Sequence, residues 1–238
     1  MKKRWFSFYF ILLYFVLNIS LGFVFLSPVN STVIASLVCL VLMSVIYYKH
    51  YKQNVTRHEI TVGHFLLICC TLVFIWSSIS FTTTWFYTAY GDSLFDSRSE
   101  TISSNPSMYI LLTLIIAPVT EELLIRGLLY NDLKRRFDPI ISCMLSALLF
   151  AILHGTLLHL YIGFVAGVFF TLIYEYTGLI YYSILFHGLY NFISLFAPNI
   201  SYHPMFFETP FVIVSNLLVF AFLILSWAFV YQRSENTK

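Results

Sequence analysis

Charged residues are scarce in this sequence. Asp, Glu, Lys and Arg together make up 10% of the 238 residues, whereas 59% are hydrophobic and the mean hydropathy is +0.83. Soluble domains carry about 25% charged residues, and this chain holds more apolar side chains than one soluble core buries. The composition therefore predicts a membrane protein with lipid as its solvent. The net charge of +2 does not indicate nucleic-acid binding.

Cysteine is also rare. The spacing of the four cysteines matches neither a disulfide framework nor a CxxC metal site, and all lie in apolar stretches, at Cys39, Cys69, Cys70 and Cys143. We therefore expect them to be buried packing residues. Internal repeats, low-complexity tracts and proline-rich linkers are absent as well, so we expect no second soluble domain.

Long apolar runs are the main feature of the sequence. A spanning helix needs about 20 apolar residues, and hydrocarbon requires every backbone polar group to be paired within the structure. Eight runs meet this requirement or come close to it, at residues 5–26, 32–48, 62–81, 108–130, 139–158, 160–174, 179–196 and 210–231. The sequence therefore predicts an all-α fold, a polytopic membrane bundle of about eight transmembrane helices. The short sixth run contains Gly163 and Gly167, a GxxxG pair that allows a neighbouring backbone to approach closely.

Lysine and arginine are unevenly distributed between the predicted loops. All but two of the 13 basic residues precede the first run or follow the second, fourth and eighth runs; the exceptions are Arg98 and Arg126. Cytoplasmic loops are enriched in Lys and Arg, so we expect a multi-pass protein of the cell membrane with both termini in the cytoplasm. The basic start is not followed by a small-residue cleavage site, so we expect the first helix to be retained.

The longest polar break, residues 82–107, separates parts of different character. It is rich in Ser, Thr and Asp, and it faces the outside in the predicted topology. We therefore divide the chain into N-terminal helices and an extracytoplasmic loop (1–107), a core that contains the polar residues described next (108–197), and a C-terminal helix and tail (198–238).

Three ionisable residues, Glu121, Glu122 and Arg126, interrupt the fourth apolar run. A charge near the centre of a bilayer costs at least about 2.5–3.5 kcal/mol, so each one requires a partner or a function. Glu122 and Arg126 are four residues apart and share a helix face, so we expect an ion pair between them. Glu121 points about 100° away and is left free. The alternative is that all three residues form a structural lock between helices.

Two further runs carry polar residues at the same spacing. Phe150 and His154 share one face of the fifth run, and His187 and Asn191 share one face of the seventh. Either histidine alone is typical of a hydrogen bond between helices. Together with a free glutamate, they predict one water-filled cavity inside the bundle.

The predicted cavity suits hydrolysis of an amide. A carboxylate beside an imidazole takes a proton from water as the water attacks a carbonyl, and returns it to the leaving amine. His187 and the Asn191 amide suit the developing oxyanion. Glu121, His154 and His187 could instead bind zinc, although the sequence contains no HExxH motif.

These residues resemble the motifs of the CAAX protease and bacteriocin-processing family of intramembrane endopeptidases, which includes type II CAAX prenyl endopeptidases. The motifs EExxxR, FxxxH and HxxxN are matched in order within about residues 108–197. The resemblance implies that this segment is a catalytic core in which Glu121 and His154 activate water while His187 and Asn191 bind the oxyanion. It also implies a metal-independent mechanism. Structural and positioning roles are expected for Glu122, Arg126 and Phe150.

The leading hypothesis is an endopeptidase that cuts a membrane-associated peptide or protein, reached from the cytoplasm or laterally from lipid. We expect no cofactor, with zinc as the alternative, and no nucleic-acid partner. A second hypothesis is a non-catalytic bacteriocin-immunity or scaffold protein that holds a peptide in the same cavity. A third is a proton-coupled transporter, which the lack of a repeat in two halves disfavours.

Overall fold

The computed structural model describes residues 6–25, 28–51, 60–90, 105–155, 157–196 and 209–235, and these ranges contain helices and no strand. The helical elements are α1 (Phe6–Phe25), α2 (Pro28–His50), α3 (Val62–Tyr90), α5 (Pro106–Leu111), η3 (Leu112–Ile116), α6 (Ala117–Glu122), η4 (Leu123–Tyr130), α7 (Asn131–Lys134), α8 (Pro139–Ile152), α9 (Leu157–Thr177), α10 (Ile180–Phe196) and α11 (Thr209–Glu235). The five elements from α5 to α7 follow one another without a break and form one long helix, in which η3 and η4 are π-helical. The predicted all-α fold is confirmed.

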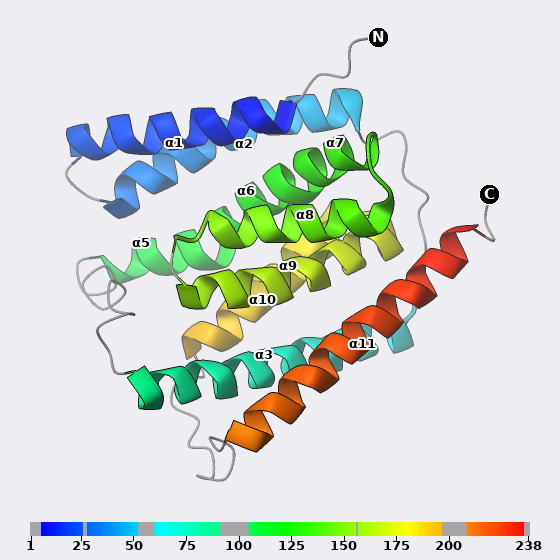
Figure 1. Ribbon diagram of the computed structural model, residues 1–238. Helices are drawn as coiled ribbons and strands as arrows, with labels where there is room; N and C mark the ends of the chain where they lie inside the picture. The colour runs from blue at the N-terminus through cyan, green and yellow to red at the C-terminus, as the bar shows by residue number, and fades with distance from the viewer. Residues whose placement is uncertain are drawn as a thin grey trace.

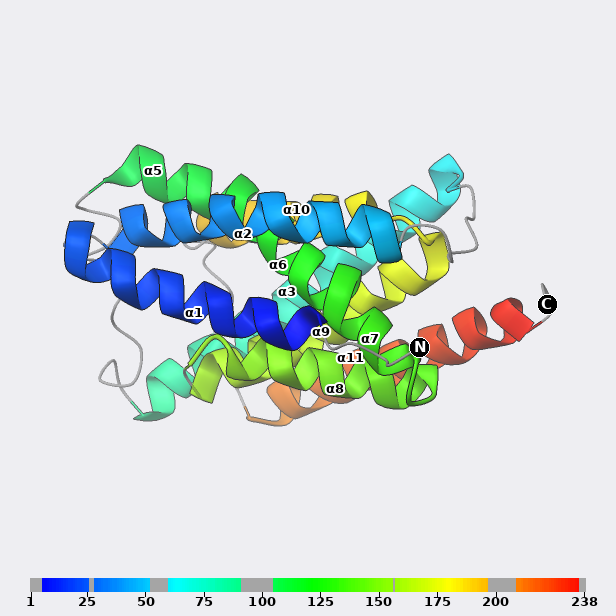
Figure 2. The same cartoon turned by 90° about the horizontal axis from the view of Figure 1, so that it is seen from above.

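In the part of the chain that the structure describes, eight helices pack into one bundle. Five are long and apolar enough to cross a membrane, and the three shorter apolar ones are Phe6–Leu21, Pro139–Ile152 and Ile180–Phe196. The first turn of α1 and the last turn of α11 lie at the same end of the bundle (Figures 1 and 2). The chain is therefore a multi-pass helical membrane protein.

A polar network ties the α1–α2 hairpin to the rest of the bundle at the end where α7 finishes, here called the basic end. The buried carboxylate of Asp132 accepts hydrogen bonds from the Ser7 hydroxyl (2.8 Å) and the Tyr51 hydroxyl (2.6 Å). Burial, together with the Asp132 carboxylate, raises the pKa of Tyr51. The Arg135 guanidinium lies 4.4 Å from the Tyr51 ring centroid.

Most predicted loop bases lie outside the described residues: Lys2, Lys3, Arg4, Lys52, Arg57, Arg98 and Lys238.

Capping residues set where several helices begin. Asn105 accepts a hydrogen bond from the Met108 amide, and Asp138 accepts from the amides of Ile140 and Ile141. Each cap is followed by a proline, whose missing N–H costs nothing in the first helical turn.

The predicted end of the fifth helix is wrong. We expected the helix to continue from 139 to 158, but α8 ends at Ile152, because Gly155 takes a left-handed conformation with φ of 76°. The next helix is correspondingly longer than expected, since α9 begins at Leu157 and ends at Thr177. With 14 residues, α8 is about 21 Å long and shorter than the hydrocarbon thickness of about 30 Å. Its far end lies well inside the ends of α1 and α5 (Figures 1 and 2).

The predicted start of the long polar break is also wrong, because α3 continues to Tyr90. The hydroxyls of Thr82 and Thr83 donate to the carbonyls of Ser78 and Ser80 within the helix. Hydroxyl side chains that bond to the preceding turn are compatible with a membrane helix. Residues 91–104 of the predicted loop lie outside the described residues.

The GxxxG pair brings α8 and α9 together. A Cβ atom at Gly163 would lie 2.9 Å from Ala151 Cα, and one at Gly167 would lie 3.0 Å from Ala147 Cα. The predicted close approach is therefore confirmed, and its partner is the small-residue face of α8.

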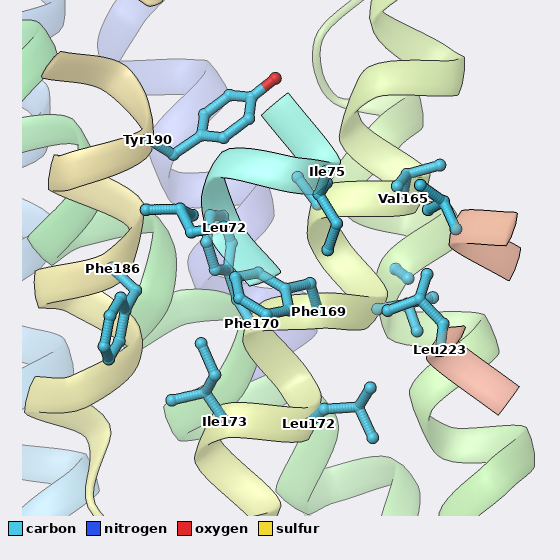
Figure 3. Packing of buried hydrophobic residues seen from close by; sticks show 14 of the residues in the cluster. Leu72, Ile75, Val165, Phe169, Phe170, Leu172, Ile173, Phe186, Tyr190 and Leu223 are labelled. Atoms are coloured by element: carbon cyan, nitrogen blue, oxygen red, sulfur yellow. The ribbon is translucent and has the colours of Figure 1, made fainter. Parts of the chain in front are cut away.

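Two hydrophobic clusters flank the polar interior. One joins α3, α9, α10 and α11, where Phe169 and Phe170 lie among side chains such as Leu72, Phe186 and Leu223 (Figure 3). The second joins α1, α2, η4 and α8, and its buried members include Cys39, Met43, Leu128 and Phe150. Cys39 and Cys143 are buried as expected, whereas Cys70 is exposed.

We predict that Gly163→Ala destabilises the protein by about 1–3 kcal/mol, because the added methyl group has no space beside the α8 backbone. Thermal unfolding of the purified protein in bilayer nanodiscs measures this effect. The matched control is Gly63→Ala, whose Cβ would meet only Thr61 Oγ1 at 3.8 Å. Equal stability of the two variants would contradict the close packing of α8 on α9.

Candidate active site

A buried ion pair forms the base of the site. Arg126 Nη1 lies 2.7 Å from Glu122 Oε1, and both side chains have 0% exposure. The other guanidinium nitrogens donate to the Gly167 carbonyl (Nη2, 2.8 Å) and to Thr171 Oγ1 (Nε, 3.4 Å) on α9. The second Glu122 oxygen, Oε2, has no hydrogen-bond partner among the described residues. The expected pairing of Glu122 with Arg126 is confirmed.

Two aromatic rings complete the environment of the guanidinium. Arg126 Cζ lies 4.8 Å from the centroid of Phe150 and 5.5 Å from that of Phe170. Phe150 also contacts both motif histidines edge to face, at 4.7 Å from the His154 ring and 5.9 Å from the His187 ring. Phe150 therefore contacts three polar side chains at once.

His187 is held by Glu122. Its Nδ1 lies 2.9 Å from Glu122 Oε1, and its ring stacks on Phe170 at 4.8 Å between centroids. A carboxylate can only accept a hydrogen bond, so Nδ1 carries the proton. The opposite nitrogen, Nε2, lies 3.8 Å from Glu121 Oε2.

His154 is held by the end of its own helix. In a continuing helix, the Phe150 carbonyl would accept from the His154 amide, but α8 ends here and this amide donates to Ala151 instead. The freed Phe150 carbonyl accepts from His154 Nδ1 at 2.8 Å. His154 Nε2 is therefore left to face Glu121 Oε2 at 4.0 Å. The ring also stacks on that of His159 of α9, at 6.2 Å between centroids.

Glu121 lies between the two imidazoles. One of its oxygens, Oε2, faces the Nε2 atoms of both His154 and His187, and its side chain is 33% exposed. The structure therefore brings Glu121, His154 and His187 together, although counting residues from the predicted helix ends places His187 nearer the cytoplasm than His154.

Asn191 lies on the same helix as His187 but has a separate contact. Its Nδ2 donates to the Thr113 carbonyl at 2.9 Å. In the π-helical stretch the amide of Ala117 bonds five residues back, to Leu112. The next amide would bond to Thr113, but residue 118 is a proline and has no N–H to donate. Asn191 therefore satisfies a backbone carbonyl that Pro118 leaves free.

A cavity of about 140 Å³ lies beside Glu121 and His154. Three of its lining residues, Ile11, Tyr14 and Phe15, come from α1. Sequence reasoning missed them because α1 carries neither a motif nor a charged residue. A cavity formed between distant helices has no local sequence signal.

The three site residues do not fit a zinc ion in this arrangement. Imidazole nitrogens and a carboxylate are suitable zinc donors. Among the described residues, however, no group of three or more His, Cys, Asp and Glu side chains is arranged to hold a metal ion. We therefore derive no chemical step through a metal.

The fold and the site define a class: a polytopic helical membrane protein with a carboxylate and two imidazoles at one site inside the bundle. Comparison with protein families identifies the class further. Residues 103–193 match the family model described as type II CAAX prenyl endopeptidase Rce1-like. The predicted resemblance to the CAAX protease and bacteriocin-processing family is confirmed over this part of the chain.

One similar protein is an uncharacterized protein of Mycoplasma capricolum subsp. capricolum. It is 33% identical over 92 residues, which cover 37% of this chain and 26% of that protein. The match thus spans about a quarter of the relative. No solved structure matches the chain.

We predict that Arg126→Met destabilises the protein by about 3–5 kcal/mol, because it leaves the buried Glu122 carboxylate without its cation. Unfolding in nanodiscs measures the loss. The control Lys134→Met removes a half-exposed ion pair with Glu175, which is worth at most about 1 kcal/mol.

The double variant Glu122→Met/Arg126→Met removes both charges together. We expect it to be more stable than Arg126→Met alone, since no unpaired buried charge remains. A double variant that unfolds more readily than the single one would contradict this account of the ion pair.

Proposed function

We propose that this protein is an intramembrane endopeptidase of the cell membrane, with its basic end in the cytoplasm. Its substrate is a membrane-associated peptide or protein. The observation that carries the proposal is the position of Glu121 Oε2, which faces the Nε2 atoms of His187 and His154 at 3.8 and 4.0 Å. The family match over residues 103–193 supports the same class of reaction.

The separation of these atoms suits a reacting water. Two acceptors bridged by the hydrogens of one water are about 4–4.5 Å apart, because each hydrogen bond is about 2.8 Å long. Water between Glu121 Oε2 and His154 Nε2 loses a proton to this pair as its oxygen attacks the scissile carbonyl carbon. The proton then passes to the departing nitrogen as the C–N bond breaks. The products are one carboxylic acid and one amine, without a covalent enzyme intermediate.

His187 is the proposed donor to the oxyanion. Since its Nδ1 proton is committed to Glu122, Nε2 donates only when the imidazole is doubly protonated. The carboxylates of Glu122 and Glu121, which face its two ring nitrogens at 2.9 and 3.8 Å, together balance the positive charges of His187 and Arg126. Asn191 contributes through its second amide hydrogen, because the first bonds to Thr113.

Glu122, Arg126 and Phe150 are proposed positioning residues. Arg126 neutralises Glu122, Glu122 orients His187, and Phe150 contacts both imidazoles. None of the three faces Glu121 Oε2 directly. Their proposed effect on the reaction is therefore to hold the reacting side chains within the bundle.

We predict that Glu121→Gln abolishes peptide cleavage, with a loss of at least about 10²–10⁴-fold, because an amide cannot accept the proton of water. The measurement compares membrane-associated and secreted peptides by mass spectrometry in cells with the native or variant protein at equal abundance. The matched control is Glu175→Gln, which changes an ion pair with Lys134 at the basic end.

Identical peptide profiles for the native protein and Glu121→Gln would overturn the peptidase proposal. If Glu121→Gln also kept the protein's biological activity, the non-catalytic immunity or scaffold function would replace it. Among the described residues, no contact favours that second function over hydrolysis.

We further propose that the reaction needs no metal cofactor. We expect the purified protein to keep its cleavage activity after incubation with EDTA or 1,10-phenanthroline, followed by gel filtration into metal-free buffer. Metal content is measured by mass spectrometry on the same samples. Stoichiometric zinc that is lost together with activity, and whose return restores it, would contradict this prediction.

A further inference from the structure

One side of the cavity beside Glu121 and His154 is formed by residues that lie outside the segment matched by the family model. Glu121 and His154 form part of its lining, and Ile11, Tyr14 and Phe15 of α1 form another part. Because α1 precedes residues 103–193, the family match says nothing about this wall. A group that enters the cavity from a bound substrate contacts α1 and the proposed catalytic residues together.

We propose that this cavity is the subsite for one apolar side chain of the substrate, next to the scissile bond, and that Ile11 and Phe15 set its size. This inference rests on the proposed peptidase function, since Glu121 and His154 place the reacting carbonyl beside the cavity. It adds a substrate class: peptides with a medium-sized apolar residue at the cleavage site.

The size of the cavity supports this choice. Its volume is about 140 Å³, and an apolar cavity of about 150 Å³ accommodates one benzene molecule. A leucine, isoleucine or phenylalanine side chain therefore fits, whereas an indole is too large.

The chemistry of the lining supports it as well. Ile11, Phe15, Leu124 and Leu153 are apolar lining residues. The hydroxyl of Thr120, another lining residue, donates to the Ile116 carbonyl of its own helix. A charged substrate side chain would lose its hydration on entry, at a cost that these residues do not offset.

The α1 wall is fixed at two points along the helix. Near the basic end, Ser7 bonds to the buried Asp132 carboxylate through both its amide and its hydroxyl. Towards the other end, Thr32 of α2 donates to Asn18 (3.0 Å), which in turn donates to the Tyr14 carbonyl (3.2 Å). A wall anchored on both sides of the cavity keeps its shape and discriminates between side chains by size.

Two α1 variants change the cavity in opposite directions. Phe15→Ala enlarges it, and Ile11→Phe fills part of it. The control is Phe8→Ala, the same substitution on α1 at a residue that is 63% exposed and does not line the cavity. Each full-length protein is reconstituted in liposomes and incubated with a proteome-derived peptide library. Mass spectrometry then identifies the new peptide termini, and Glu121→Gln defines the background.

We expect the native protein and Phe8→Ala to share a preference for Leu, Ile or Phe at one position beside the cut. Phe15→Ala should raise relative cleavage at Trp by at least about tenfold, and Ile11→Phe should shift the preference to Ala and Val by a similar factor. Unfolding temperatures of the variants show whether lost activity reflects lost structure, in which case Phe15→Leu and Ile11→Leu replace them.

The result that would contradict the subsite differs from the result that would contradict the peptidase function. If cleavage depended on Glu121 but Phe15→Ala and Phe8→Ala had the same size preference, the proposed subsite would be wrong. The proposed peptidase function would be unaffected. Charged residues accepted at every position beside the cut would also overturn it. If the new peptide termini were as abundant with Glu121→Gln as with the native protein, both the proposed function and the proposed subsite would be wrong.

Discussion

The buried pair of Glu122 and Arg126 is the interaction on which the rest of the interior depends. Two charges in a membrane bundle are costly unless they neutralise each other, and further hydrogen bonds to them lower that cost. The guanidinium meets this requirement by reaching the backbone of α9 at Gly167 and the ring of Phe150 on α8, while the carboxylate reaches His187 on α10. One ion pair on one helix therefore fixes the relative positions of three others.

This arrangement separates the roles of two adjacent glutamates. Glu122 has 0% exposure and is paired with Arg126, whereas Glu121 has 33% exposure and faces two imidazole nitrogens. The difference follows from helix geometry, because adjacent residues differ by about 100° in direction. His187 lies between the two carboxylates, with one ring nitrogen towards each. A single ring thus links the structural pair to Glu121.

Local sequence patterns predicted the structural features that depend on residues close together in the chain. The apolar runs predicted the helices, and the four-residue spacing predicted the ion pair of Glu122 with Arg126. Gly163 predicted a close contact between two helices. Tertiary features had no such signal. The α1 wall of the cavity depends on packing between distant segments, and the bond from Asn191 depends on a π-helical stretch followed by a proline. The end of α8 was missed because Leu157 and Leu158 extend the apolar run beyond the turn, although a glycine such as Gly155 is typical just after a helix end.

That missed helix end gives the FxxxH motif a physical meaning. Had α8 continued, the Phe150 carbonyl would have been shared between the His154 amide and Nδ1. Because the helix ends, the carbonyl accepts from Nδ1 and turns Nε2 towards Glu121. Asn191 follows the same principle, since it satisfies a carbonyl that Pro118 leaves free. In a medium without water, each break in a helix requires a polar side chain, and here the breaks orient the side chains of the site.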